Sequence, residues 1–300
     1  MSERRKHLEF LRKTAKDALW AGDYERALTL YEDGLALARA WKDRDLEDLF
    51  TCNRVTTLIE MDRQDFDLSR LKEILLRNPS TYNGILAAQV SANAHEARSE
   101  YAKARFYADM ALQKSRELGL DEGLERGLNQ LGNLELYESH FETARDLFGE
   151  ALERVQARGE SDSHRAALYS DNLGYCYIAL NQVDVGVPLV SRSVELFEKL
   201  GAKQALDYPC LDLCFANVKQ DRFPAAENWG LRALELGEQF RRTDVVKNSH
   251  YLLAEIYSEL QRESDADLHY EALADFYPNF PMLKNYLRQI SLVDVINLRA

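Results

Sequence analysis

The sequence predicts an all-α protein built as a stack of helix pairs, and three observations carry this prediction. A short pattern of residues recurs about every 40 positions along most of the chain. Within each copy the recurring residues are three or four positions apart, which is the spacing of one helix face. The 300 residues include only 14 Gly and 6 Pro, which leaves few of the turn residues that strands and hairpins require.

The recurring pattern has an aromatic residue, a small residue, a bulky group and a second small residue. The best copies are Tyr24-Ala27-Tyr31-Gly34, Tyr101-Ala104-Ala108-Ala111, Phe141-Ala144-Phe148-Ala151 and Phe223-Ala226-Gly230-Ala233. Looser copies are centred on Gly186 and Ala266. The interval between the first and second best copies is close to two periods, so a degenerate copy is expected between them, near Phe66.

Each copy is preceded by another helical stretch, whose small residue lies about twelve positions upstream. These upstream small residues are Ala15, Ala92, Gly132, Gly174, Cys214 and Ala254. Small residues at fixed points let two helices approach closely, so we expect antiparallel pairs that each bury an apolar face against the next. The pattern predicts seven such units, over residues 8–43, 46–80, 82–119, 122–159, 163–201, 204–241 and 244–279.

The end of the chain departs from the repeat. The segment FYPNFP contains two prolines, and a run rich in apolar residues follows it. A terminal unit of a stacked repeat must cover an apolar face. We therefore predict a solenoid over residues 1–280 and a capping helix over residues 281–300. A partner or dimer surface is the alternative interpretation of the same apolar residues.

The repeat resembles the tetratricopeptide repeat. The residues that carry the resemblance are Leu131-Gly132 and Leu173-Gly174 with Tyr177, Ala144 with Phe148, Ala266 with Tyr270, and Pro278 at the end of the last unit. The period of about 40 exceeds the usual 34 residues and looks like the long-repeat variety found in kinesin light chains and bacterial peptide-sensing regulators. Over residues 8–280 the resemblance implies a right-handed α-solenoid of about seven antiparallel helix pairs. One departure is Pro188, which should kink the second helix of its unit.

Composition disfavours several classes of partner. With 38 Lys+Arg and 50 Asp+Glu, the net charge is −12, whereas surfaces that bind nucleic acid or anionic lipid usually carry a basic excess. No run approaches the roughly 18 apolar residues of a membrane span, and no signal-peptide pattern is present. Four cysteines in 300 residues fit a reducing compartment. We expect a cytoplasmic protein that binds neither nucleic acid nor membrane.

No catalytic pattern stands out in the sequence. There is no phosphate-binding glycine loop, dinucleotide fingerprint, serine-hydrolase motif or paired CxxC. His95-Glu96 begins like a zinc-protease helix, but Ser99 stands where the second metal ligand would be needed. His140 is expected at a solvated turn. We therefore expect no enzymatic activity, no cofactor and no metal.

The resemblance also implies where a ligand would bind. In tetratricopeptide proteins the first helix of each pair lines a concave groove and supplies most ligand contacts. Carried onto this chain, the resemblance gives these peptide-binding candidates: Gln89, Asn93, Arg126, Asn129, Asn133, Asp171, Tyr175, Leu211, Phe215, Asn248, Tyr251 and Glu255.

The chemistry of these candidates favours an extended peptide. Asn is a poor residue for helix interiors, and its amide can both donate to and accept from a peptide backbone. Leu211, Phe215 and Tyr251 would offer an apolar pocket for an anchoring side chain, and Asp171 would favour a basic one. The alternative is that the amides only satisfy neighbouring helices.

We therefore expect a non-enzymatic module that binds an extended segment of another protein in its concave groove. One alternative is a peptide-responsive regulatory sensor that acts through a separate effector protein, since the first repeat begins too early to leave room for a helix-turn-helix. Another alternative is a scaffold that forms a homodimer through its C-terminal helix.

Overall fold

The computed structural model describes residues 3–63, 65–277 and 280–299, and among these it contains helices and turns but no strand. The chain divides into two compact units, Met1–Leu134 and Glu135–Ala300. The boundary between the two units falls inside a helix, α7 (Asp121–Tyr137), within the solenoid predicted over residues 1–280.

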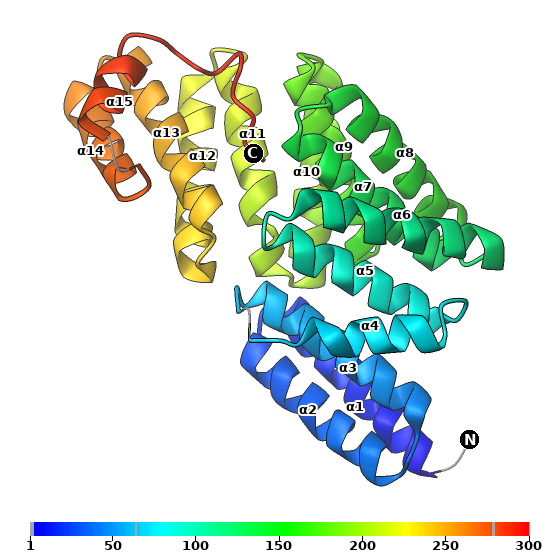
Figure 1. Ribbon diagram of the computed structural model, residues 1–300. Coiled ribbons are helices and arrows are strands. Elements are labelled where there is room, and N and C mark those ends of the chain that lie inside the picture. The colour runs from blue at the N-terminus through cyan, green and yellow to red at the C-terminus, as the bar shows by residue number, and fades with distance from the viewer. Residues whose placement is uncertain (1–2, 64, 278–279, 300) are drawn as a thin grey trace. The chain divides into compact units, whose positions relative to one another are not determined.

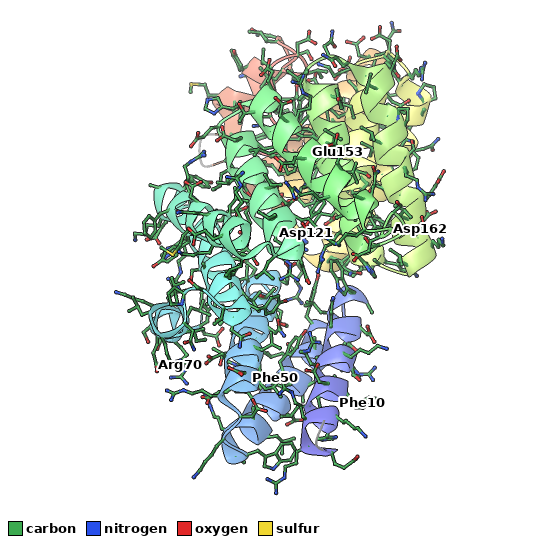
Figure 2. The ribbon with its side chains drawn as sticks, turned by 90° about the vertical axis from the view of Figure 1, so that its right-hand side faces the viewer. Phe10, Phe50, Arg70, Asp121, Glu153 and Asp162 are labelled. Carbon is green, nitrogen blue, oxygen red and sulfur yellow. The ribbon has the colours of Figure 1, made fainter. Side chains whose placement is uncertain are left out.

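The N-terminal unit consists of helix pairs joined by short turns (Figure 1). Its helices are α1 (Glu3–Trp20) with α2 (Tyr24–Ala40), α3 (Arg44–Glu60) with α4 (Leu68–Arg77), α5 (Tyr82–Glu96) with α6 (Tyr101–Leu118), and most of α7. Phe50 lies fully buried inside this unit, edge-on to Tyr31, whereas Phe10 projects from α1 into solvent with 64% of its surface exposed (Figure 2).

The C-terminal unit continues the same alternation of first and second helices. After the end of α7 it contains α8 (Phe141–Ala157), α9 (His164–Ala179), α10 (Val183–Leu200), α11 (Asp207–Val218), α12 (Phe223–Phe240), α13 (Thr243–Glu259), α14 (Glu263–Ala272) and α15 (Phe280–Leu287). Short 3₁₀ turns at Lys203–Ala205 and Leu273–Asp275 precede α11 and follow α14. Among the described residues, the regular structure is thus helical throughout, and the chain is an all-α solenoid.

The turns explain why so few glycines suffice. Within each pair, one turn residue adopts the left-handed backbone conformation, and these residues are Gly22, Asp62, Ser99, Ser139, Asn181, Asp221 and Gln261. Around Asn181, the backbone N–H of Gln182 donates to Tyr177 O at 2.8 Å, which satisfies a carbonyl at the end of α9. Asn and Asp tolerate this conformation better than other non-glycine residues. The helix ends are thus closed largely without glycine.

Small residues of the repeat lie where helices touch. The repeat residues Ala104, Ala144, Ala226 and Ala266 are fully buried. A Cβ added to Gly174 in α9 would lie 2.6 Å from Val190 Cγ2 and 3.0 Å from Gly186 O in α10. The two backbones therefore approach as closely as glycine permits. Pro188 lies within α10, which continues through it to Leu200.

The capping helix predicted over residues 281–300 is wrong beyond Leu287. The helix α15 ends there, and residues 288–299 form turns, a bend and irregular stretches. Ser, Asp and Asn recur in this stretch and compete for backbone hydrogen bonds, while its β-branched residues have low helix propensity. Pro278, expected to close the last unit, lies outside the described residues. None of the described helices combines the length and the apolar content that crossing a bilayer requires.

Candidate functional site

In the N-terminal unit, two of the predicted amides connect first helices to each other. Gln89 of α5 is buried, and its Nε2 donates to Gly123 O of α7 at 3.0 Å. Gln130 of α7 returns the contact, because its Nε2 donates to Gln89 O at 2.7 Å and to Asn93 Oδ1 at 2.5 Å. Gln89 and Asn93 thus satisfy neighbouring helices, which is the alternative role described above.

The other candidates of this unit lie on α7. Arg126 is partly exposed, and its Nη2 lies 2.6 Å from Glu122 Oε1, one helical turn earlier. Asn129 and Asn133 are half-buried.

In the C-terminal unit, the candidates face a segment of the chain itself. After α15, residues Ser291–Arg299, here called the terminal segment, run back to the first helices α9, α11 and α13 (Figure 1). The surface that these three helices present to the terminal segment is here called the α9–α13 face.

Three side chains of this face bond to the backbone of the terminal segment. Tyr251 Oη of α13 accepts a hydrogen bond from Leu292 N at 2.8 Å. Tyr175 Oη of α9 accepts one from Leu298 N at 2.8 Å, and Asn248 Nδ2 of α13 donates to Leu298 O at 2.8 Å. Such contacts recognise backbone groups whatever the side chains of the segment are.

The Asn297 side chain is held by polar groups at the end of α7 and in the turn that follows. Its Nδ2 donates to Leu136 O at 2.6 Å and to Ser139 Oγ at 3.0 Å, and its Oδ1 accepts from Tyr175 Oη at 2.9 Å. The side chain of the next residue, Leu298, is buried, with an exposed fraction of only 1%. An amide and an apolar side chain are therefore both seated against the α9–α13 face.

Arg299 enters a buried cluster of carboxylates and tyrosines. Its Nη2 donates to Asp212 Oδ2 at 2.6 Å and lies 3.6 Å from Asp171 Oδ2. The guanidinium carbon is 4.4 Å from the ring centre of Tyr175 and 4.3 Å from that of Tyr208, which are cation–π distances. The cluster offers the opposite charge and the flat surfaces that a guanidinium prefers.

Burial makes these carboxylates reluctant to ionise. It raises the pKa of Asp212 to about 6 and that of Asp171 well above its ordinary value, and the charge of Arg299 opposes both shifts. Burial also raises the pKa of Asp207 to about 6, with Arg242 as the main opposing charge. The cluster therefore needs a cation in order to carry its negative charge near neutral pH.

Two further groups of the face approach the terminal segment. Lys219, the residue that caps the C-terminal end of α11, lies 3.6 Å from exposed Asp294 and above the ring of Phe215. Burial raises the pKa of Glu255, although hydrogen bonds with Ser291 and Tyr270 favour its charged form. The remaining candidate, Leu211, is fully buried in α11.

The sequence analysis missed three residues of this site, Tyr208, Asp212 and Lys219. A signal for one of them was present. Asp212 stands within the run CLDLCFA, in which all the remaining residues are apolar. A carboxylate in such a helix needs a buried partner. That the partner is Arg299, 87 residues later in the chain, follows only from the tertiary structure.

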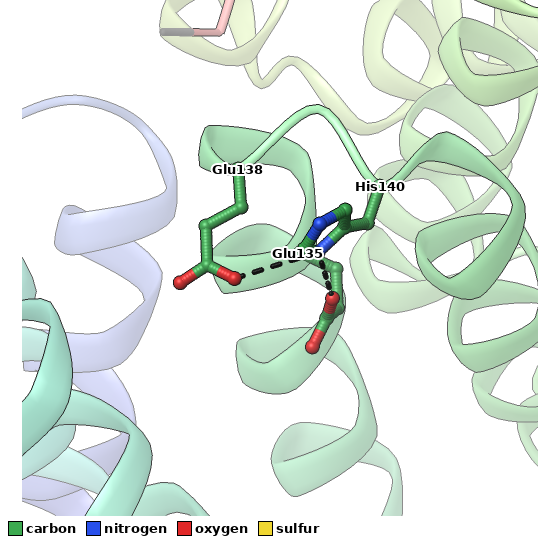
Figure 3. Close-up of side chains that lie close together, drawn as sticks. All are labelled: Glu135, Glu138 and His140. Atoms are coloured by element: carbon green, nitrogen blue, oxygen red, sulfur yellow. Dashed lines mark hydrogen bonds and ion pairs between the residues drawn. The ribbon is translucent and has the colours of Figure 1, made fainter.

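A second cluster lies at the turn between α7 and α8. Glu135, Glu138 and His140 have ligand atoms within 4.8 Å of one another (Figure 3). His140 Nδ1 lies 2.8 Å from Glu135 Oε2 and 3.4 Å from Glu138 Oε2, and the imidazole is 58% exposed. The imidazole thus already pairs with both carboxylates, and exposed clusters of this kind are common without a bound ion.

Comparisons with known proteins identify the fold but no sequence relative. No protein-family model matches the chain, and no curated protein matches it by sequence. A Rap protein complexed with the competence and sporulation factor is 13% identical, with a TM-score of 0.66 over 93% of this chain and 76% of its own. The Rap conjugation gene regulator of plasmid pLS20, in complex with the Phr* peptide, is 14% identical, with a TM-score of 0.67 over 92% and 78%.

A third solved structure of the same kind is BtubC of P. vanneervenii. It is 22% identical, with a TM-score of 0.56 over 73% of this chain and 92% of its own. At these identities the similarity establishes the arrangement of helices, not the ligand. Together with the all-helical structure of the described residues, it shows that the chain is an α-solenoid of the tetratricopeptide-repeat type.

Proposed function

We propose that the chain is a non-enzymatic interaction module, and that its α9–α13 face binds an extended peptide segment of a partner protein. The observation that carries this proposal is that the side chains of Tyr175, Asn248 and Tyr251 hydrogen-bond to backbone N–H and C=O groups of the terminal segment. A face built to satisfy backbone N–H and C=O groups suits a peptide ligand.

Side-chain selectivity would come from the buried cluster around Asp171 and Asp212. A carboxylate pair accompanied by two tyrosine rings favours a guanidinium over a neutral side chain, because removal of the cation leaves charge buried and unpaired. Two solved structures of similar fold are complexes with a signalling factor or peptide, which supports a peptide ligand here.

The polar candidates of the N-terminal unit remain part of this proposal as separate contact points. Asn133 and Arg126 come first among them, since Gln89 and Asn93 already bond within their own unit. We place the module in the cytoplasm, because all four cysteines are unpaired thiols.

The test is direct binding of a defined peptide to a variant whose terminal segment no longer occupies the α9–α13 face, here called the vacated chain. Leu298→Asp with Arg299→Glu should detach the terminal segment, because it would bury two carboxylates beside Asp171 and Asp212. A fluorescein-labelled peptide of sequence SLVDVINLR should then bind with a dissociation constant in the micromolar range, as measured by fluorescence anisotropy.

Matched controls show whether the binding uses the proposed face. Adding Asp212→Asn to the vacated chain should weaken binding at least ten-fold, and a peptide with Glu in place of its Arg should not bind. If the vacated chain retains its helical circular dichroism but ignores the peptide, the α9–α13 face is not a peptide-binding site.

A further inference from the structure

The terminal segment has the position and chemistry of a ligand rather than of a capping helix. It contributes backbone N–H and C=O groups, an apolar side chain and a basic side chain, and the α9–α13 face has a partner for each. We propose that the terminal segment is an internal competitor that occupies the α9–α13 face; this inference rests on the proposed function. A partner segment that has an arginine directly after an apolar residue would displace it.

The anchoring contacts are concentrated at the end of the segment. Asn297, Leu298 and Arg299 supply most of the hydrogen bonds and the buried apolar contact. Upstream, Val295 has 78% of its surface exposed, and Asp294 is equally open to solvent. A segment held mainly by its last three described residues can leave without unfolding the helices beneath it.

The segment also has little structure of its own to lose. Its internal backbone hydrogen bonds are those from Val295 N and Ile296 N to Leu292 O, at 2.9 and 2.7 Å. Val293 N and Arg299 N bond to side chains of the segment itself, at Ser291 Oγ and Asn297 Oδ1. Its remaining backbone hydrogen bonds are with side chains of the α9–α13 face. An incoming segment that offers the same groups would therefore replace the contacts with the face one for one.

The charge cluster limits how tightly the segment is held. Asp171 Oδ1, Asp212 Oδ1 and Arg299 Nη1 are buried, and none has a hydrogen-bond partner among the described residues. Unsatisfied buried polar atoms of this kind reduce the net gain from an ion pair. The pair selects for arginine strongly but stabilises the closed state only moderately, which is what an exchangeable ligand requires.

The contacts also define the partner. The segment that replaces this one should present an arginine that reaches Asp171 and Asp212, an apolar residue directly before it, and an amide or similar polar group before that. This pattern reproduces Asn297-Leu298-Arg299 in trans. A partner that lacks the arginine would leave the carboxylates without a cation once the terminal segment has moved.

The effect of internal competition can be estimated from tethering. A short tether holds its ligand at an effective concentration on the order of 1 mM. If the free peptide binds the vacated face with a dissociation constant of about 10 μM, competition should weaken its apparent affinity for the native chain about 100-fold. A segment that closes only part of the time would give a proportionally smaller factor.

The experiment compares three full-length chains with the same labelled peptide SLVDVINLR. They are the native chain, the vacated chain with Leu298→Asp and Arg299→Glu, and a control with Val295→Asp at the exposed position of the same segment. We expect the vacated chain to bind at least 30-fold more tightly than the other two, which should resemble each other.

Two results would overturn the internal competition. If the peptide binds the native and vacated chains equally well, the face is a peptide-binding site but the terminal segment does not compete for it. If the native chain sediments as a dimer that the vacated chain does not form, the segment occupies the face of a second copy instead. Failure of every chain to bind the peptide would refute the proposed function itself, so the two hypotheses fail in distinguishable ways.

Discussion

Replacing Arg299 by alanine is expected to lower the free energy of unfolding of the C-terminal unit by about 3 kcal/mol at pH 8 and by much less at pH 5. The guanidinium is the cation that lies between Asp171 and Asp212, and both carboxylates are at least 97% buried. Removing one partner of a buried ion pair leaves the other charged and unpaired, which typically costs about 3–5 kcal/mol. Without the Arg299 side chain the terminal segment would be held less firmly, and water could partly reach both carboxylates. We therefore expect a cost at the lower end of this energy range.

The pH dependence follows from the direction of the pKa shifts. Burial raises the pKa of Asp212 to about 6 in the folded chain, above its ordinary value of 3.8, so the folded state binds more protons between these values. The contribution of this carboxyl to stability therefore falls as the pH rises through that window. Without Arg299 the folded pKa is higher still, and the fall continues to higher pH.

The difference in the free energy of unfolding between the native chain and the Arg299→Ala variant should thus be small at pH 5 and grow above about pH 6. Urea unfolding at pH 5 and pH 8, followed by circular dichroism, measures this difference. The matched control is Arg192→Ala, because Arg192 pairs with Asp162 on the surface at 2.7 Å and should contribute at most about 1 kcal/mol. An equal loss at pH 5 and pH 8 would mean that Arg299 stabilises the unit by packing rather than by charge.

Gly174→Leu is expected to destabilise the C-terminal unit by about 3 kcal/mol or more. A Cβ at this position would already lie 2.6 Å from Val190 Cγ2, 3.0 Å from Gly186 O and 3.1 Å from Val190 N. Overpacking usually costs about 1–3 kcal/mol, and here two of the three obstructing atoms belong to the backbone of α10, which cannot rotate away. The gain in helix propensity, about 1 kcal/mol, is too small to compensate.

A second glycine separates overpacking from a general effect of substituting glycine. Gly149 lies in α8, and a Cβ added there would meet no atom within 4 Å. Gly149→Leu should therefore leave the melting temperature unchanged or raise it slightly, whereas Gly174→Leu should lower it by several degrees. Similar melting temperatures for the two variants would show that α9 and α10 do not approach as closely as described.

The repeat could be read from the sequence because it is local and recurs in phase. Spacings of three and four predict a helix face wherever they occur, and copies such as Phe141-Ala144-Phe148-Ala151 place the same face in successive units. The resemblance assigns ligand contacts to the first helix of each pair, and this led to Asp171, Tyr175 and Tyr251, all of which contact or lie beside the terminal segment.

Other features could not be read in this way. The two-unit division at Leu134 and Glu135 depends on how densely successive pairs contact each other, which a repeat that continues through the boundary does not reveal. The amides of Gln89 and Asn93 share the residue type expected of ligand contacts, yet they bond to Gln130 and Gly123. Residue type and spacing cannot distinguish these two uses of an amide.

The sequence by itself determined the class of fold, because helix periodicity and small residues at close contacts are local properties that repeat along the chain. It also indicated which helices present polar and aromatic side chains together. Only the tertiary structure decided what those side chains hold. The pairing of Arg299 with Asp171 and Asp212 joins residues far apart in the chain, and its energy depends on burial that exists only after the helices have stacked. The same long-range contacts explain why residues 288–299 are not helical, since side chains of the α9–α13 face bond to backbone groups that a helix would otherwise use.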